Sequence, residues 1–299
     1  MNTPFTSERK SLLPIYGLYF LVFAFISSTA QAWAPVTDTE RMLLRQMGYP
    51  TNTVEQILEA TKSESYFVRY AALDLLTERI GKDASPVLKQ FVSDSHLKVR
   101  MIAAHILGTL GDKSGLKQMQ KDFKELAAKA AIPLPTDPNM DPDMRELIES
   151  ERKIALYDAL EVAKVLAELG DRQGYKLATK AATESIWEPH REKAIYVLAE
   201  IAKADPNILS AESRDPVSIL CAMAESEKSP YVFSKIIYSA AKLPYEESVR
   251  ILDKAKISSK QSQEKRNEAE GFISWLKAKK KAAEIQAKDP NAPKNQSKK

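Results

Sequence analysis

The sequence predicts an all-α protein whose architecture is an α-solenoid, a stack of about five helical pairs. The first indication is composition, because only 9 of 299 residues are glycine and runs of β-branched residues bounded by turn residues are scarce. The second is an internal repeat. Four stretches align in one frame: "YFVRYAALDLL" (66–76), "LKVRMIAAHIL" (97–107), "EPHREKAIYVL" (188–198) and "SPYVFSKIIYSAAKL" (229–243). Residues 158–170 add a fifth copy, and a period of about 31 residues is typical of stacked helical pairs.

The amino terminus has the three-part layout of a secretory signal. Arg9 and Lys10 precede the uncharged run "SLLPIYGLYFLVFAFI", and "SSTAQA" ends in a small-x-small pattern. We expect residues 1–32 to be a signal peptide removed before Trp33, so that the chain is exported to the periplasm or secreted. The alternative is an uncleaved membrane anchor, since residues 11–36 carry no charge and about 20 residues cross a bilayer.

The remaining chain divides into a leader, the repeats, a cap and a tail. Residues 33–52 form the leader, with a short helix near 38–47 that Gly48 and Pro50 end. The repeat solenoid covers residues 53–256, and its helical pairs are expected at 53–80, 83–110, 115–169, 173–203 and 215–243. A cap of two helices follows Pro244, with a capping helix in 257–288, and residues 289–299 form a disordered basic tail.

The repeats contain their own packing signals. In residues 97–111 the apolar side chains fall on one stripe, which predicts a single buried face. Aligned alanines let a neighbouring helix approach, namely Ala72, Ala103 and Ala194. The motif "LGD" occurs at 110–112 and 169–171: the glycine ends a helix in a left-handed turn, and the aspartate caps the next helix.

These residues resemble the HEAT repeats, in particular the HEAT-like repeats of the phycobilisome lyase type. The resemblance is carried by "VRYAALDLL", "VRMIAAHILGTLGD" and "VLAELGD" and covers roughly residues 53–256. It implies that the aligned Arg69, Arg100 and Arg191 bond within or between repeats; copies three and five lack this arginine. It also implies that the second helix of each pair lines the concave side. The lyase resemblance offers one enzymatic alternative, attachment of a bilin to a cysteine of another protein, against which export argues.

The expected binding surface lies on the second helices, opposite the predicted stripe. Positions 101 and 105 project about 180° away from the buried residues of their helix. Carrying this frame along the chain gives one row of Tyr70, Met101, Glu192 and Ser234, and another of Asp74, His105, Lys164, Tyr196 and Tyr238. Tyrosine is a frequent interface anchor, so the predicted binding residues are Tyr70, Asp74, His105, Tyr196 and Tyr238. The alternative is that the tyrosines only shield neighbouring helices.

Sites for metals and catalysis are not indicated. The Pro-rich insertion 132–143 holds alternating Asp137, Asn139, Asp141 and Asp143, as in calcium loops, but Pro142 and Ile148 occupy the positions of the required glycine and glutamate. A helix cap at Asp141 or Asp143 is the other interpretation. The three histidines are scattered, and no phosphate-binding, nucleophile-elbow or zinc-protease motif is present. We expect no cofactor, no metal and a buried Cys221.

Charge is unevenly distributed along the chain. The net charge is +4, but residues 254–299 carry 13 basic and 5 acidic residues, or +8, whereas residues 33–253 carry 29 and 34, or −5. The tail lacks the interleaved aromatic residues on which nucleic-acid bases stack, so we expect no specific nucleic-acid partner. We expect contact with a membrane only if the amino-terminal segment stays uncleaved. The predicted function is an exported, non-catalytic scaffold that binds a protein or peptide on its concave face. The alternative is an enzyme or ligand carrier with a site in that groove.

Overall fold

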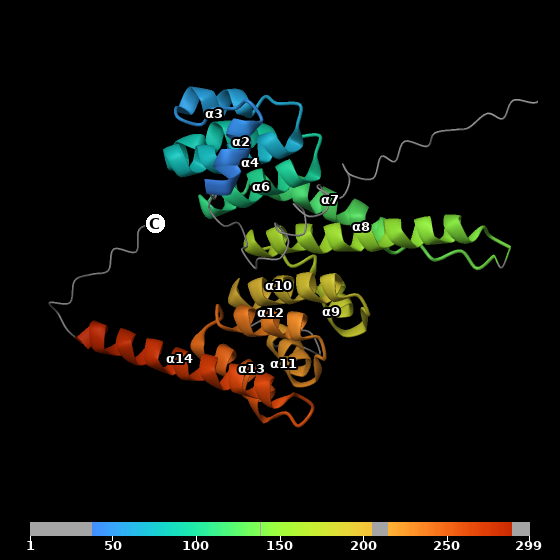
Figure 1. Cartoon of the computed structure of the whole chain (residues 1–299), viewed down its shortest axis with the longest axis vertical. Helices are drawn as coiled ribbons and strands as arrows, with labels where there is room; N and C mark the ends of the chain where they lie inside the picture. Colours follow the sequence, from blue (N-terminus) through green and yellow to red (C-terminus); the bar gives the residue numbers. More distant parts are fainter. Residues whose placement is uncertain (1–37, 138, 205–214, 289–299) are drawn as a thin grey trace, which may run out of the picture.

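The structure, a computed structural model, describes residues 38–137, 139–204 and 215–288 (Figure 1). Within these ranges every regular element is a helix, which confirms the all-α prediction. The expected signal peptide, the mature end at Trp33 and the tail 289–299 lie outside the described residues.

The helices form pairs that stack in chain order (Figure 1). After the leader helix α2 (Asp38–Gln46) come α3 (Val54–Ala60) with α4 (Tyr66–Ile80), η1 (Gly81–Ala84) and α5 (Ser85–Phe91) with α6 (Leu97–Thr109), α7 (Leu116–Ala130) with α8 (Pro142–Glu168), α9 (Tyr175–Glu184) with α10 (Glu188–Ala204), and α11 (Pro216–Ser226) with α12 (Pro230–Ala240). The cap consists of α13 (Tyr245–Ile257) and α14 (Gln263–Lys288). The second helices α4, α6, α8, α10 and α12 pack on one another in sequence, and these observed pairs match the predicted ones. The fold is therefore an α-solenoid.

The prediction of a single buried face on the second helices is wrong for α6. Val99 and Ala103 lie in the core shared with α4, as expected, but Met101 and Ala104 are equally buried in the core shared with α8. Because α6 lies between α4 and α8, apolar residues are buried on both of its sides. Met101, which we expected on the exposed row, is only 2% exposed.

The repeated "LGD" motif ends one pair and starts the next. Gly111 and Gly170 have φ values of 84° and 83°, in the left-handed region that glycine tolerates best. The following aspartates accept a hydrogen bond from the amide two residues later, at 2.8 Å in both copies. They close the turn but, contrary to the prediction, do not cap the next helices, because the N-cap residues of α7 and α9 are Gly115 and Gly174. Three residues further, Gly115 and Gly174 touch an alanine of the preceding second helix: a Cβ there would lie 2.6 Å and 2.3 Å from the Cβ atoms of Ala104 and Ala163. The motif is therefore a close-packed helix–turn–helix joint.

The aligned arginines are structural, as the resemblance implied. Arg69 makes a two-pronged ion pair with Asp94, at 2.8 Å for both bonds, while its third nitrogen donates to the carbonyls five and six residues earlier in its own turn. Arg100 does the same with Asp122 and Arg191 with Glu227. Each arginine therefore fastens the turn of its own pair to a carboxylate of the next.

A lysine of the cap replaces the missing arginine of the fifth pair. Phe233 occupies the arginine position in α12. The carbonyls five and six residues before it, those of Glu227 and Lys228, accept hydrogen bonds from Lys265 Nζ of α14 at 2.9 and 3.1 Å. Lys265 also lies over the Phe233 ring, 4.9 Å from its centroid. The fifth turn is thus held from outside its own pair.

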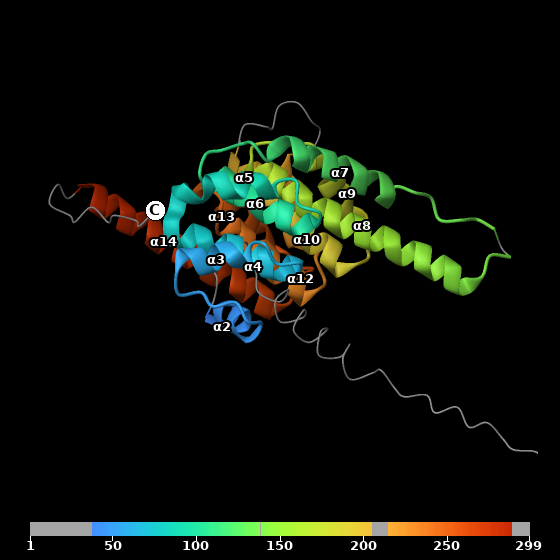
Figure 2. The same ribbon diagram turned by 90° about the horizontal axis from the view of Figure 1, so that it is seen from above.

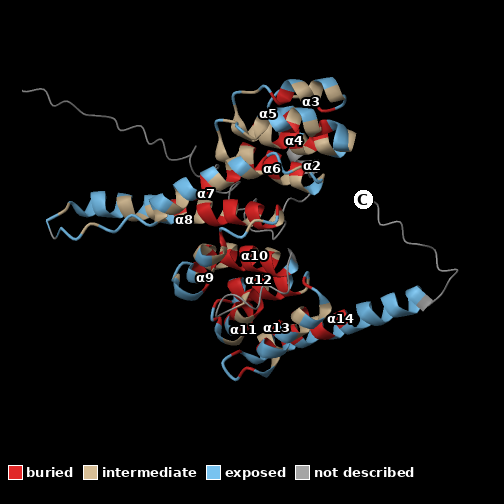
Figure 3. Ribbon diagram, turned by 180° about the vertical axis from the view of Figure 1, so that it is seen from behind, coloured by how far each residue is buried: buried red, intermediate tan, exposed pale blue. Residues whose placement is uncertain are grey.

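The insertion joins α7 and α8 into a hairpin that projects sideways from the stack (Figure 3). Asp141 caps α8 by accepting a hydrogen bond from the Asp143 amide at 2.8 Å, which confirms the capping interpretation for that residue. The loop side chains Ile132 and Leu134 are exposed. The insertion therefore emerges at the edge of the stack, as predicted.

Candidate functional site

The second helices α6, α8 and α10 share an ionic cluster centred on Glu161. Lys98 of α6 and Lys193 of α10 each reach the Glu161 carboxylate of α8 at 2.6 Å, one to each oxygen. Lys98 also lies 3.7 Å from Asp158, one helical turn away. The cluster therefore joins three successive pairs across one surface.

Tyrosines surround this ionic cluster. The Tyr157 ring lies between Lys98 and Lys193, whose Nζ atoms are 5.7 and 5.0 Å from its centroid. The hydroxyls of Tyr196 and Tyr231 both donate to Glu192, at 3.1 and 2.7 Å. Two χ angles and an anchored hydroxyl leave these rings little freedom.

Lys235 of α12 completes the surface. Its Nζ lies 3.7 Å from Glu192 and 4.8 Å from the Tyr231 ring centroid. We call this set of side chains the second-helix network: Lys98, Tyr157, Asp158, Glu161, Glu192, Lys193, Tyr196, Tyr231 and Lys235. Lys193 Nζ lies 5.8 Å from the Tyr196 ring centroid and joins the Glu161 group to the Glu192 group, so the network is continuous from α6 to α12.

Electrostatics keep the central ion pair of the network charged. Burial acts to raise the pKa of Glu161, but the charges of Lys98 and Lys193 outweigh it and lower that pKa to about 2. Burial likewise acts to lower the pKa of Lys193, and the Glu161 charge outweighs it, so that this pKa is raised. Burial raises the pKa of Tyr196, reinforced by the charge of Glu192. At neutral pH Glu161 and Lys193 are therefore a charged pair beside a neutral Tyr196.

A second cluster links α6 to α8 nearby. His105 Nδ1 lies 2.7 Å from Glu168, and Lys164 lies 2.8 Å from the same carboxylate. Burial acts to raise the pKa of Glu168, but the hydrogen bond from His105 and the charge of Lys164 lower it. His105 therefore lies beside Lys164, and the sequence analysis had placed these two residues in the same row.

The other predicted binding residues do not form a single group. Tyr196 belongs to the second-helix network, whereas Tyr238, 52% exposed, stacks edge-on against Phe272 of α14 at 5.7 Å. Tyr70 and Asp74 lie half-buried on α4. The leader helix α2 packs on α4, and Figure 2 shows it on the opposite side of the stack from α5, α7 and α9.

Sequence reasoning misplaced Glu192, as it did Met101, and missed several residues. Glu192, expected on the exposed row, is 6% exposed because Tyr196, Tyr231 and Lys235 converge on it. The missed members include Lys98, Tyr157 and Tyr231. Each lies seven residues before a position of the predicted row, which is two helical turns along the same face. Extending the row by that step would have found all three.

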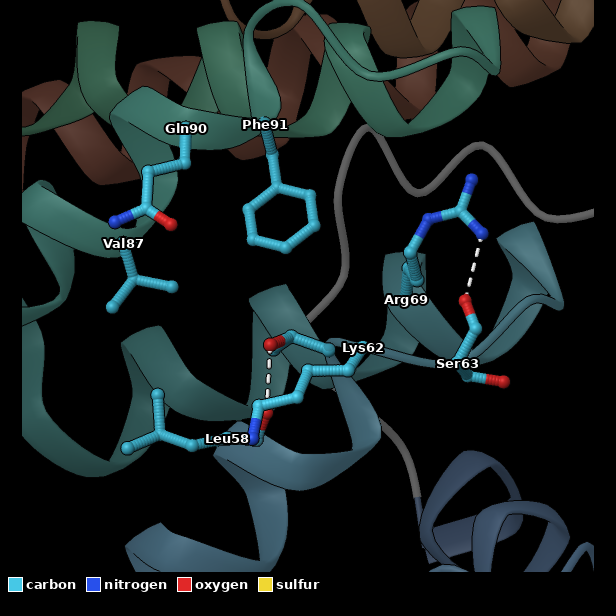
Figure 4. A pocket seen from close by; sticks show the side chains of 8 residues that line it. Leu58, Lys62, Ser63, Arg69, Val87, Gln90 and Phe91 are labelled. Atoms are coloured by element: carbon cyan, nitrogen blue, oxygen red, sulfur yellow. Dashed lines mark hydrogen bonds between the residues drawn. The ribbon is translucent and has the colours of Figure 1, made fainter.

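A separate pocket of about 630 Å³ lies between α3 and α5 (Figure 4). Leu58, Val87 and Phe91 form its apolar lining, with Lys62 and Gln90 beside them. Arg69 also borders it, but its guanidinium is engaged by Asp94 and by the carbonyls of its own turn. The pocket therefore offers mainly apolar contact.

The described residues give little support for a metal site or a reactive thiol. Among the described residues, no group of three or more His, Cys, Asp or Glu side chains is placed to hold a metal ion. Cys221 is buried, as predicted, and burial raises the pKa of its thiol. A raised pKa disfavours the thiolate that reacts.

Comparison with known proteins identifies the repeat. Residues 54–132 match the family model of HEAT repeats. No curated protein matches the chain. Within the described part of the chain, no helix combines the length and the apolar character needed to cross a membrane. The matched segment spans α3 to α7, and the same pairing of helices continues to α12. Residues 54–132 are therefore similar to HEAT repeats, and the described chain has the fold of an α-solenoid.

Proposed function

We propose that this chain is an exported, non-catalytic HEAT-repeat scaffold that binds a protein or peptide partner on the surface formed by its second helices. The observation that carries the proposal is the second-helix network, which continues through four successive pairs. Stacked repeats commonly present such extended surfaces to partners.

The chemistry of the network suits binding better than catalysis. Its carboxylates are each matched by a lysine or a tyrosine hydroxyl, and such an arrangement suits a preformed contact surface. Its tyrosines are held in place before a partner arrives, and rigid aromatic side chains lose little entropy on binding. Tyr231 is 38% exposed and Tyr238 52% exposed, so both offer contact area.

Affinity capture from the exported fraction tests this proposal. The variants Tyr231→Ala and Tyr238→Ala should weaken capture of the recovered partner by at least about 1 kcal/mol each, a usual threshold for a contributing contact. Tyr175→Ala, which removes a half-buried tyrosine of the first helix α9, is the matched control. Full capture of the partner by both folded variants would eliminate these tyrosines as anchors. If the variants instead fail to fold, the tyrosines serve to shield neighbouring helices.

Export is tested separately. The amino-terminal pattern predicts cleavage after residue 32, so mass spectrometry of the purified chain should find Trp33 as its first residue. An intact Met1 in a soluble cytoplasmic fraction would contradict export.

A further inference from the structure

The carboxyl-terminal half of α14 extends beyond the stack (Figure 1). The last buried residue of this helix is Leu276, and every side chain from Lys277 to Ala287 is exposed. Between Gly271 and Lys288 there are five lysines and one glutamate, a net charge of +4. The packed half holds the helix on the stack, so the exposed half is a basic arm.

One face of this arm is apolar. Trp275, Ala278, Ala282 and Ile285 are spaced three, four and three residues apart, which places them within an arc of about 80° on a helix. Trp275 is 50% exposed and Ile285 61% exposed. All four of these side chains are exposed, and Trp275 makes an aromatic contact with Phe272.

Aromatic side chains extend the stripe onto the stack. Trp275 contacts Phe272 at 6.4 Å between ring centroids, and Phe272 contacts Tyr238 of α12 at 5.7 Å. The exposed aromatic surface is thus continuous from the arm to the last repeat.

Lysines border the stripe on both sides. Lys279 and Lys281 lie about 80° to either side of its centre on a regular helix, and Lys279 Nζ is 5.0 Å from the Trp275 ring centroid. Lys280 is different, because it turns back to the stack, where it pairs with Glu246 at 3.2 Å and lies over Tyr245.

We propose that this face of α14, with Phe272, is a docking surface for an anionic lipid bilayer. A basic helix with an exposed Trp and a narrow apolar stripe has the composition of helices that lie in the headgroup region. Lysine stems can lie along the acyl boundary while their ammonium groups reach the phosphates.

The shape of the stripe favours a lipid surface over a protein groove. Helices that fill protein grooves use large anchors on successive turns, whereas here two alanines separate Trp275 from Ile285. Shallow burial of this kind suits an interface, where the tryptophan ring lies at headgroup depth. The body from residue 33 to 253 has a net charge of −5, from 29 basic and 34 acidic residues. The charge complementary to an anionic bilayer is therefore concentrated near the carboxyl-terminal arm, which would orient the chain on the membrane.

Vesicle flotation of the chain as purified from cells tests the proposal. The vesicles are phosphatidylcholine alone and an equimolar mixture with phosphatidylglycerol. The wild type should float with the mixed vesicles and not with phosphatidylcholine, and binding should weaken as salt is added. Each lysine near an anionic surface strengthens binding about fivefold. Lys279→Gln combined with Lys281→Gln should therefore weaken binding about 25-fold, and Trp275→Ala about fivefold.

The control removes the same charge elsewhere. Lys124→Gln combined with Lys129→Gln changes two exposed lysines of α7 and should leave binding unchanged. Thermal melts establish that the lysine variants stay folded. If the amino-terminal apolar run inserts into the bilayer instead, the chain should bind both kinds of vesicle, and the α14 lysine substitutions should not change that binding.

Three results would overturn the proposal: no preference for the anionic vesicles, equal binding by the α14 and α7 variants, or lysine-dependent binding to a polyglutamate peptide without binding to vesicles. The last result would assign the arm to an acidic protein partner. None of these results bears on the second-helix network, because the α14 variants leave that surface intact.

Discussion

Replacing Glu161 by glutamine tests the centre of the second-helix network. The substitution keeps the shape of the side chain but removes the negative charge that Lys98 and Lys193 share at 2.6 Å. The pKa of Glu161 is lowered from 4.5 to about 2. At about 1.4 kcal/mol for each pH unit, this difference corresponds to about 3 kcal/mol of folding free energy. Loss of one partner of a buried ion pair typically costs a similar amount, about 3 to 5 kcal/mol.

The sign of the pH dependence follows from the lowered pKa. Folding favours the ionised carboxylate, so its contribution is complete above about pH 4.5 and is lost as the pH falls toward about 2. Denaturant unfolding followed by circular dichroism should show Glu161→Gln to be less stable than wild type by about 3 kcal/mol at neutral pH. The difference should shrink as the solution is acidified through that range.

A surface carboxylate provides the matched control. Glu125 of α7 pairs with Lys121 at 3.9 Å, and both side chains are at least 60% exposed. Glu125→Gln should therefore change stability by less than about 0.5 kcal/mol. If Glu161→Gln behaves like this control, the network does not stabilise the stack as argued.

Four further substitutions test the packing. Gly174→Ala should destabilise the fold by about 1 to 3 kcal/mol in thermal melts, because its Cβ would lie 2.3 Å from that of Ala163. At Gly271 an added Cβ would have nothing within 4 Å, so Gly271→Ala should stabilise α14 by up to about 1 kcal/mol. Lys265→Met should speed proteolytic release of α14, because two carbonyl hydrogen bonds are lost. Burial lowers the pKa of His190, so wild type should lose stability as the pH falls below about 6.5 and His190→Gln should lose less, measured by melts at several pH values.

Each of these has a contradicting outcome. Equal melting temperatures for the two glycine variants would mean that the helix–turn–helix joint is loosely packed. Unchanged release of α14 from the lysine variant would mean that its carbonyl contacts do not hold the cap. A parallel acid response of wild type and the histidine variant would assign that response to other groups.

Local patterns determined which parts of the fold the sequence could predict. The helix ends at Gly111 and Gly170 depend on a backbone conformation that glycine favours, and the aligned arginines repeat at one position of each turn. Such features recur within one repeat, so alignment of the chain with itself is enough to find them. The pairing of helices followed from the same signals.

The second-helix network could not be predicted in the same way. Glu192 is buried by Tyr231 and Lys235, which lie 39 and 43 residues later, so its environment depends on how two pairs stack. Periodicity within one helix marks a polar position as exposed and does not show that a neighbour covers it. Lys265 was missed for a related reason, because its acceptors are backbone carbonyls, which leave no trace in side-chain patterns.

Site-specific photo-crosslinking in the producing cells tests most directly whether the second helices form the partner surface. A photoreactive amino acid replaces Tyr231 on α12 in one variant and Lys176, exposed on the first helix α9, in the other. We expect a crosslinked product with the exported partner at position 231 and none at position 176. A product at position 176 alone, or equal products at both positions, would contradict the assignment of the binding surface to the second helices.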